Sequence, residues 1–409
     1  MYYIGKATRS VVETTQPSCF HRAIKCVLIT AQCFGLIPVY GVTEPHVNRL
    51  RFKWFSLKTI YCVLATVGLV LNTMLFILQY LRDDQFGVLV SVVFFSLQTL
   101  GYLLFLKLAR NWHTVSSEWQ DVDITMHKYN YQPNLQRRFK VTMIILLGMA
   151  FLEHLLFTLK TIRIAENCPN FQTDPLRTYC GIAFTHVFTV TPYAHWKILL
   201  PELPSILGTF QWNFLDLFLV LLSAALAERF KQINKAVLDT QVKNESFWKQ
   251  IREDYTKLWT MCQTINDSVC HLVSLSFGGN LFFICWQMFN SVRPMTGTVQ
   301  TIYFCYSFGY LVGRTLVVSM YCCWINDEGK EVLASLFNLA SQYYGPEANR
   351  LIQQICAAPP ALSGSNSFLV TRDLCLQIAG AVITFELILL QIGPSFLQTD
   401  KQVPQLCLT

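Results

Sequence analysis

The chain has 409 residues, of which 53% are hydrophobic and only 14% are charged. A soluble domain of ordinary composition carries about 25% charged residues, so this composition excludes a soluble globular protein and indicates an integral membrane protein. The formal net charge is +7, but basic residues that stand between long apolar stretches do not form the basic patch of a nucleic-acid-binding protein. We therefore expect one membrane domain and no nucleic-acid partner.

Seven long apolar stretches follow one another along the chain. A helix needs roughly 20 apolar residues to cross the hydrocarbon core of a bilayer, and each stretch is near or above this length. The sequence therefore predicts an all-α membrane protein with seven transmembrane helices, at about 59–81, 86–106, 141–159, 205–227, 269–292, 301–324 and 374–393.

The charges around the first stretch predict the orientation of the chain. The flank before it is basic and has no acidic residue between positions 45 and 58, whereas the flank after it holds Arg82, Asp83 and Asp84. Because basic flanks stay in the cytoplasm, we expect a cytoplasmic N-terminus and, after seven crossings, an extracellular C-terminus. This orientation is the reverse of that of a G-protein-coupled receptor.

The topology divides the chain into alternating membrane and aqueous segments. An uncharged run at 26–43 is interrupted by Gly and Pro, and we interpret it as an interfacial or re-entrant element. An eighth crossing there is the alternative; it would invert the topology and expose the glycosylation sequons at Asn244 and Asn266. The expected segments are a cytoplasmic N-terminal segment (1–58), transmembrane helices 1–4 (59–227), a cytoplasmic helical anchor (228–268), helices 5 and 6 (269–324), a second cytoplasmic segment (325–373), helix 7 (374–393) and an extracellular tail (394–409).

The cytoplasmic anchor carries a regular apolar spacing. Its apolar residues recur at alternating intervals of three and four, as in a heptad seam. We expect the fifth helix to continue below the membrane and to pack against partner helices that hold an assembly together. The alternative is an amphipathic helix lying on lipid headgroups. The seam consists of Trp248, Ile251, Tyr255, Leu258 and Cys262.

Nothing in the sequence predicts an enzyme. HExxH, P-loop, GxSxG and GxGxxG motifs are absent from it, and the 15 cysteines show neither a CxxC pair nor a His/Cys zinc spacing. We expect no metal and no cofactor. Cys168 and Cys180 share the long outer loop 160–204 and are predicted to form a disulfide; two free thiols are the alternative.

Four ionisable residues lie inside the predicted helices. Such groups are costly in lipid and are therefore candidates for functional sites. From the helical rise of about 1.5 Å per residue, all four fall between the outer face and the middle of the membrane. They are Glu153, His154, Asp216 and Arg314.

Amide and aromatic residues fall at similar depths on neighbouring helices. Carboxylates and amides exchange hydrogen bonds with hydroxyl groups, and aromatic faces cover the C–H face of a sugar ring. We therefore predict an outward-facing pocket for a neutral, polyhydroxylated ligand. The alternatives are a buried ion pair of Arg314 with Asp216 or Glu153, and Trp and Tyr residues that belong to packing or to the interface belt. The added pocket residues are Trp212, Asn213, Trp286, Gln287, Tyr306 and Tyr310.

The last helix carries a stripe of small and polar residues. Gln377, Ala381, Thr384, Ile388 and Gln391 are spaced by four and three residues and share one face. In a symmetric oligomer this face would line a central pore, with Ile388, Gln391 and Ile392 as a narrow gate. Ordinary helix packing through small residues is the alternative.

Residues 384–392, Thr-Phe-Glu-Leu-Ile-Leu-Leu-Gln-Ile, resemble the C-terminal signature of insect gustatory receptors, in which Thr-Tyr is followed by apolar residues and Gln-Phe. Thr384 and Gln391 match, while Phe385 stands in place of Tyr and Ile392 in place of Phe. Longer stretches resemble the sugar-receptor branch of that family, at 211–230, 249–262, 276–294, 314–330 and 361–374.

The resemblance implies a tetrameric, ligand-gated cation channel in the plasma membrane of taste neurons. It implies homotetramers, or heterotetramers with related gustatory receptors, each subunit binding ligand in the outer half of helices 2–6. The seventh helices would line one central pore for cations, with Gln391 and Ile392 at the gate. We thus expect a sugar-gated, non-selective cation channel embedded in lipid, gated by a mono- or disaccharide. The alternatives are a G-protein-coupled chemoreceptor, a sugar transporter, or a channel of this family tuned to a non-sugar ligand.

Overall fold

The computed structural model describes residues 19–83, 86–129, 134–240, 243–291 and 297–397. All seven predicted helices are present in it, and the prediction of an all-α membrane protein is confirmed. Six of the described helices are long and apolar enough to cross a membrane, and α12 is the seventh. The seven are α3 (Leu57–Asp83), α4 (Phe86–Met126), α5 (Leu135–Glu166), α8 (Leu199–Asp239), α9 (Glu245–Ser291), α10 (Thr298–Phe337) and α12 (Arg372–Leu397).

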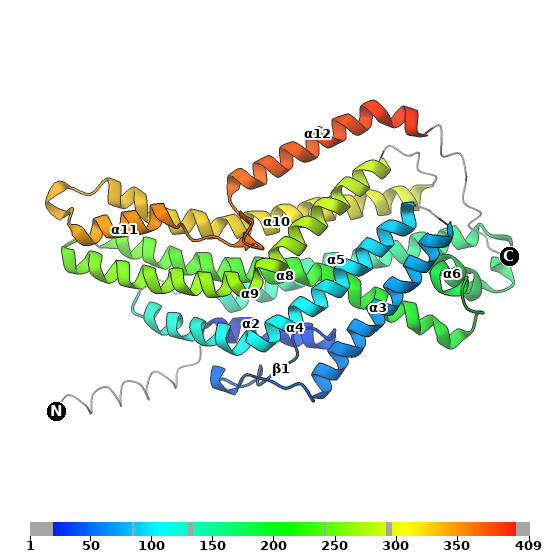
Figure 1. The fold of residues 1–409 in the computed structure, drawn as a ribbon, viewed down its shortest axis with the longest axis horizontal. Helices are drawn as coiled ribbons and strands as arrows, with labels where there is room; N and C mark the ends of the chain where they lie inside the picture. The colour runs from blue at the N-terminus through cyan, green and yellow to red at the C-terminus, as the bar shows by residue number, and fades with distance from the viewer. Residues whose placement is uncertain (1–18, 84–85, 130–133, 241–242, 292–296, 398–409) are drawn as a thin grey trace.

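Several helices are much longer than a bilayer is thick. Helix α9 has 47 residues and α4 has 41, which at 1.5 Å per residue corresponds to roughly 60–70 Å, about twice the hydrocarbon core. The helices therefore continue beyond the membrane as a second, water-facing bundle. Figure 1 shows this bundle at the end that carries α11 (Pro346–Ala357).

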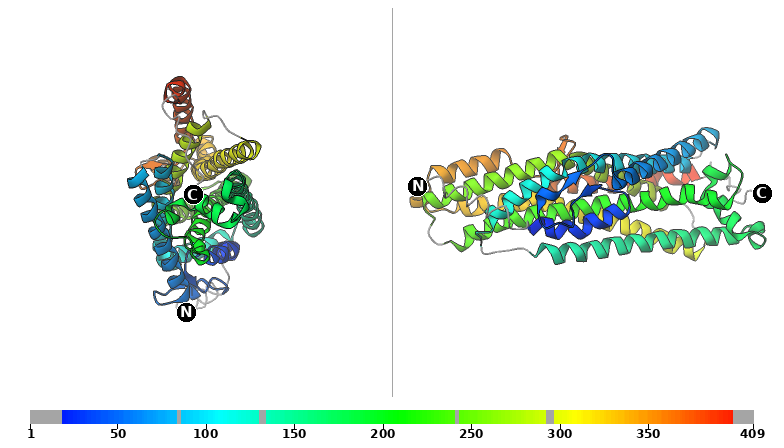
Figure 2. Two further views of the ribbon diagram at one scale, coloured as in Figure 1. Left: turned by 90° about the vertical axis from the view of Figure 1, so that its right-hand side faces the viewer. Right: turned by 90° about the horizontal axis from the view of Figure 1, so that it is seen from below.

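Helix α8 forms the centre of the molecule. It packs on α3, α4, α5, α9 and α10, and 89% of its most apolar stretch is buried. A helix that is apolar on every side is buried on every side, and α8 meets this description from Phe214 to Phe230. The end-on view in Figure 2 shows green helices in the middle of the bundle and the red end of α12 apart from it.

The heptad seam of α9 is covered by the chain itself. All five seam residues are at most 1% exposed. The Tyr255 ring packs on Phe230 of α8 at a centroid distance of 5.5 Å, and its hydroxyl donates to the Gly329 carbonyl of α10 at 2.9 Å. The structure thus differs from the expectation that the seam joins subunits, because α8, α10 and α11 extend beside α9 and supply the partners.

The run at 26–43 does not form an eighth crossing. Helix α2 (Cys19–Cys33) covers only residues 26–33 of this run, and a crossing needs roughly 20. The chain then turns at Gly35, where φ is +75°. It continues into a small antiparallel pair of strands, β1 (Val39–Tyr40) and β2 (Arg51–Phe52), followed by α3.

A compact cap covers the opposite end of the bundle, between α5 and α8. We call this the capped end. The Asp174 side chain caps α6 by accepting from the Arg177 backbone N–H at 3.0 Å. The cap comprises the 3-10 turns η2 (Pro169–Gln172) and η3 (His195–Ile198) with α6 (Pro175–Ala183) and α7 (Thr185–Phe188).

The predicted Cys168–Cys180 disulfide is not present in this cap. Cys168 is disulfide-bonded, whereas Cys180 is a free thiol inside α6. Its side chain is completely buried, and burial raises the pKa of the Cys180 thiol to about 11. The shared loop did not determine the pairing, because the helical turns of the cap turn Cys180 into the packed interior.

Helix α12 stands apart from the rest of the bundle (Figure 1). It packs mainly along α9 and α10, and large apolar side chains remain uncovered on it, with Leu376 71% and Ile383 61% exposed. After α11, a hairpin of β3 (Ser363–Gly364) and β4 (Phe368–Leu369) leads into α12 and is attached to α9 by the bond from the Ser365 N–H to the Cys270 carbonyl.

Candidate functional site

A cavity of about 990 Å³ lies among the helices at the capped end. Six long helices end there and the cap folds over them, so all six helices and the cap contribute to its wall. The lining residues come from α3 (72–79), α4 (87–95), α5 (153–160), the α6–α7 cap (179–186), α8 (201–212), α9 (283–290) and α10 (300–307).

Aromatic rings and hydrogen-bonding groups both line this wall. The first class covers apolar ligand surface and the second fixes hydroxyl or amide groups, a combination typical of small-molecule sites. Aromatic lining residues include Phe76, Phe94, Phe157, Trp212, Phe283, Trp286 and Tyr303; polar ones include Asn72, Ser91, Glu153, His154, Gln287, Asn290 and Ser307.

Three of the polar residues form a hydrogen-bonded chain across α5, α10 and α9. The Ser307 hydroxyl donates to Glu153 Oε1 at 2.6 Å, and Gln287 Nε2 donates to Ser307 Oγ at 3.2 Å. Gln287 Oε1 is buried and has no hydrogen-bond partner among the described residues. An unmatched buried acceptor costs about 1–3 kcal/mol, so this atom is a ready acceptor for a ligand hydroxyl.

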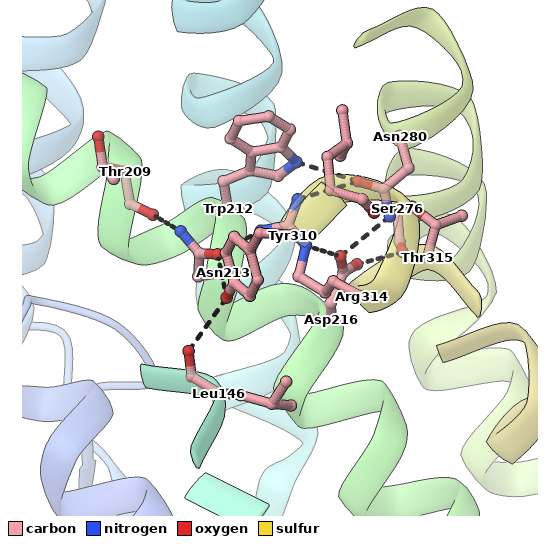
Figure 3. A network of polar contacts seen from close by, with 11 residues as sticks. Leu146, Thr209, Trp212, Asn213, Asp216, Ser276, Asn280, Tyr310, Arg314 and Thr315 are labelled. Carbon is pink, nitrogen blue, oxygen red and sulfur yellow. Dashed lines mark hydrogen bonds and ion pairs between the residues drawn. The ribbon is translucent and has the colours of Figure 1, made fainter. Parts of the chain in front are cut away.

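A second polar cluster lies deeper, centred on Asp216 of α8 (Figure 3). Arg314 Nε of α10 is 2.8 Å from Asp216 Oδ2. From α9, Ser276 donates to Asp216 Oδ1 at 2.5 Å and Asn280 Nδ2 donates to Asp216 Oδ2 at 2.9 Å. Both carboxylate oxygens are therefore occupied, and Arg314 has paired with Asp216 rather than with Glu153.

The remaining donors of Arg314 are directed to amide oxygens. Arg314 Nη2 donates to Asn280 Oδ1 at 3.2 Å, and Nη1 donates to Asn213 Oδ1. The Tyr310 hydroxyl lies 2.9 Å from the same Asn213 oxygen and 3.0 Å from the Leu146 carbonyl of α5. We call this group, centred on Asp216 and Arg314, the buried network; it ties α5, α8, α9 and α10 together.

Trp212 connects the cavity to the buried network. Its ring lines the cavity, its indole Nε1 donates to Asn280 Oδ1 at 3.2 Å, and the Arg314 guanidinium lies 4.5 Å from its ring centroid. A cation over an indole ring is a favourable contact. A ligand that moves this ring would therefore disturb contacts of Arg314 directly.

The structure separates the ten predicted ligand-binding residues into groups. Glu153, His154, Trp212, Trp286 and Gln287 line the cavity. Tyr306 belongs neither to the cavity lining nor to the buried network, and it donates to the Met149 carbonyl at 3.0 Å. The other four belong to the buried network: Asn213, Asp216, Tyr310 and Arg314.

Two parts of the wall were not anticipated from the sequence. Asn72 and Phe76 of α3 line the cavity, as do Tyr179 and His186 of the cap. Asn72 carries a signal that could have found it, since a buried amide in an apolar span is itself a site candidate. His186 lies in a loop whose folding over the bundle has no local signal.

The predicted pore residues lie on the free part of α12. Thr384, Ile388 and Gln391 are exposed in the single chain, and the Thr384 hydroxyl donates to the Gly380 carbonyl at 2.9 Å. The side chain of Ile392 lies outside the described part of the structure. Across the described residues, no group of three or more His, Cys, Asp or Glu side chains is arranged to hold a metal ion.

The whole length of the chain matches a known family. Residues 6–407 fit the profile described as "Trehalose receptor". The chain belongs to the trehalose receptor family. Its relatives in Drosophila melanogaster include the gustatory receptor for sugar taste 64f, 31% identical over 91% of this chain and 80% of the relative. Another is the gustatory receptor 5a for trehalose, 31% identical over 91% and 85%. The family is one of receptors, in agreement with the expectation that the chain is not an enzyme.

Solved structures confirm the fold of this family member. The insect olfactory receptor OR5 from Machilis hrabei, in complex with eugenol, superposes with a TM-score of 0.67, covering 90% of this chain and 97% of the other at 13% identity. A second structure of the same receptor gives a TM-score of 0.65. The chain is thus a multi-pass membrane protein with the insect olfactory receptor fold.

Proposed function

We propose that the chain is a subunit of a sugar-gated, non-selective cation channel that acts as a gustatory receptor in the plasma membrane of taste neurons. Its N-terminus would be cytoplasmic, so that the capped end faces the outside. Four copies, or copies combined with related gustatory receptors, would form the channel. The relatives named for sugar taste and for trehalose support this proposal.

The cavity at the capped end is the observation that carries the proposal. Its wall combines the Glu153–Ser307–Gln287 chain with the aromatic faces of Trp212 and Trp286. A sugar presents hydroxyl groups around its edge and C–H groups on its faces, and this wall offers partners for both. We propose that these residues and His154 contact the sugar, while Asn213, Asp216, Tyr306, Tyr310 and Arg314 hold the wall in place.

Gating would run through the two helices that the cavity and α12 share. Helices α9 and α10 line the cavity and are also those on which α12 packs. A sugar that binds more tightly to the cavity shape of the open channel shifts the population toward that shape. Movement of α9 and α10 would then displace α12, whose Thr384, Ile388, Gln391 and Ile392 would line the central pore.

The uncovered apolar surface of α12 supports an assembly around that helix. Its side chains at Leu376, Ile383, Leu387 and Ile388 are 45–71% exposed in the described chain, and a symmetric ring of copies would bring four such helices together around one axis. The same arrangement would place the stripe of small and polar residues toward the ions.

The deciding experiment is electrical. The full chain is expressed in cells without taste receptors, its surface delivery is checked, and excised patches are exposed to mono- and disaccharides without GTP. A sugar-evoked cation current is the expected result. Sugar uptake without current would instead favour the transporter, and a response that requires GTP would favour the G-protein-coupled receptor.

Orientation is tested independently at the sequon of Asn244, which is exposed. In the proposed topology this residue is cytoplasmic and stays unmodified, whereas a glycan on it would contradict the topology. The sequon of Asn266 is a poor reporter, because its side chain is buried and accepts from the Ser363 N–H at 2.7 Å.

A further inference from the structure

The cavity has a polar corner between α3 and the cap, formed by other helices than those that carry the Glu153–Ser307–Gln287 chain. His186 Nε2 of α7 lies 2.9 Å from Asn72 Oδ1 of α3, and each of these residues is only 3% exposed. Both line the cavity. We call this pair the Asn72–His186 corner.

One polar atom of this corner is left unmatched. Asn72 Nδ2 is buried and has no hydrogen-bond partner among the described residues. If the Asn72 amide were rotated by 180°, its nitrogen would face His186 and its oxygen would be unmatched. One of the two amide atoms of Asn72 therefore lacks a partner in either orientation. A buried amide group without a partner is unfavourable, so a hydroxylated ligand in the cavity would supply what the protein does not.

The imidazole of His186 is held in place by aromatic rings. It stacks on Phe76 with a centroid distance of 3.8 Å and an interplanar angle of 20°, and it meets the edge of Phe184 at 6.4 Å. Burial lowers the pKa of His186 to about 3, so the ring is neutral at the pH of extracellular fluid. A fixed, neutral imidazole orients the Asn72 amide without adding a charge to the cavity.

The corner and the Glu153 chain are built on different helices. Helix α3 packs on α4, α7 and α8, whereas α5 packs on α2, α6, α8 and α10. The end-on view of Figure 2 shows α3 and α10 on different sides of the bundle. The cavity therefore carries hydrogen-bonding groups from different helices, and aromatic residues such as Trp212 and Phe94 line it as well.

We propose that the Asn72–His186 corner is a second sugar subsite, which binds the second ring of a disaccharide whose first ring is bound at the Glu153–Ser307–Gln287 chain. This inference rests on the proposed function and narrows the ligand class from sugars in general to disaccharides. Asn72 Nδ2 donates to a hydroxyl of the second ring, and His186 fixes the orientation of the amide. A volume of about 990 Å³ is at the upper end of the range for small-ligand sites, in keeping with a two-ring ligand.

The test compares a disaccharide with its own single ring. Purified full-length receptor is titrated calorimetrically with trehalose and with glucose. Asn72→Ala should weaken trehalose binding about tenfold, since a site built to bond a hydroxyl group depends on that bond, and should leave glucose binding unchanged. Glu153→Gln should weaken both sugars. The matched control is Thr73→Val: Thr73 is the next residue of α3, is buried and bonds its own helix at the Leu69 carbonyl, but does not line the cavity.

A second variant protects the test against a folding defect in the first. His186→Phe keeps the stack on Phe76 but removes the bond to Asn72, and it should reproduce the selective loss of trehalose. Equal losses for both sugars in Asn72→Ala and His186→Phe, or the same loss in Thr73→Val, would overturn the second subsite. A wild-type receptor that binds glucose but not trehalose would overturn it as well while leaving the proposed function standing. A receptor that binds none of the mono- and disaccharides applied to the patches would overturn the proposed function itself.

Discussion

Arg314 and Asp216 form an ion pair of 2.8 Å in the middle of the helix bundle, with side chains that are 2% and 0% exposed. The pair joins α10 to α8, and amides from α8 and α9 complete its hydrogen bonds. Breaking a buried pair by removing one partner leaves an uncompensated charge, which is more costly than replacing both partners. The pair is therefore a structural element next to the cavity.

Removal of the carboxylate should destabilise the whole receptor. Asp216→Asn leaves the Arg314 guanidinium without a counter-charge, and the expected loss is roughly 3–5 kcal/mol of unfolding free energy. Thermal melting in detergent and surface delivery should both fall. The double variant Asp216→Leu with Arg314→Met should regain most of the melting temperature; a double variant no more stable than Asp216→Asn would contradict the ion-pair account.

Glu153→Gln should affect binding and spare folding. The carboxylate accepts from Ser307 alone among the contacts described, and Gln retains an acceptor there, so the packing is preserved. Hydrogen bonds to a charged group contribute about 1.5–3 kcal/mol, so the sugar concentration for half-maximal current should rise roughly tenfold or more. Glu166→Gln is the matched control on the same helix, because Glu166 is exposed and pairs only locally with Arg163. An unchanged dose–response curve for Glu153→Gln would remove Glu153 from the site.

A pair of thiols provides a direct test of whether α12 moves. Cys323 Sγ of α10 and Cys375 Sγ of α12 are 3.3 Å apart. An added oxidant such as hydrogen peroxide would take two electrons and two protons from them to form a disulfide, and the peroxide would be reduced to water. If gating needs α12 to shift against α10, the sugar-evoked current should fall on oxidation and recover with dithiothreitol.

The control for this experiment is the adjacent thiol. Cys322→Ser should remain sensitive to the oxidant, since Cys322 faces Ser223 of α8, while Cys323→Ser should be insensitive. Mass spectrometry would report the disulfide independently of function. A cross-link that forms completely without changing the current would show that the two helix ends move together.

Acid should loosen the water-facing bundle at Glu347. Its carboxylate accepts from Arg252 of α9 at 2.5 Å and from Arg350 at 2.6 Å, and chiefly the Arg252 bond lowers its pKa below the usual value. A carboxyl group with a lowered folded pKa contributes stability above its unfolded pKa, and this contribution is lost as pH falls through the folded pKa. The melting temperature of Glu347→Gln should therefore change less between about pH 5 and pH 3 than that of the wild type. Glu331→Gln, at an exposed position of α10, should melt like the wild type throughout.

The number and place of the helices could be predicted because crossing a bilayer imposes a minimum apolar length. Their continuation beyond the membrane could be predicted only where a pattern marks it, as in the seam from Trp248 to Cys262. Which surface that seam meets could not be predicted, since a heptad specifies a helical partner and not the chain that supplies it. In the structure, Tyr255 of the seam contacts Phe230 and Gly329 of the same chain.

Only part of the candidate site could be predicted, because the sequence does not show which neighbours a buried side chain meets. The high cost of burying polar groups makes Glu153 and Asp216 equally good candidates for a binding site. Depth along a helix does not distinguish them, since it does not determine the neighbours of a side chain. Asp216 meets Arg314, Ser276 and Asn280 and is fully satisfied, whereas Glu153 lines the cavity. His186 could not be found at all, because its position depends on how the cap folds back onto α3.

A single chain supplies six helices and the cap around the cavity, while α12 leaves apolar residues uncovered by that chain. In the proposed tetramer, we therefore expect each subunit to bind its own sugar molecule, whereas all four subunits share one gate. When wild-type copies are mixed with copies that have a disabled cavity, the sensitivity of the current to sugar should fall gradually as the fraction of disabled copies rises. Mixing in copies with a damaged α12 should act as a dominant defect, since one faulty helix alters the only pore that the four subunits have.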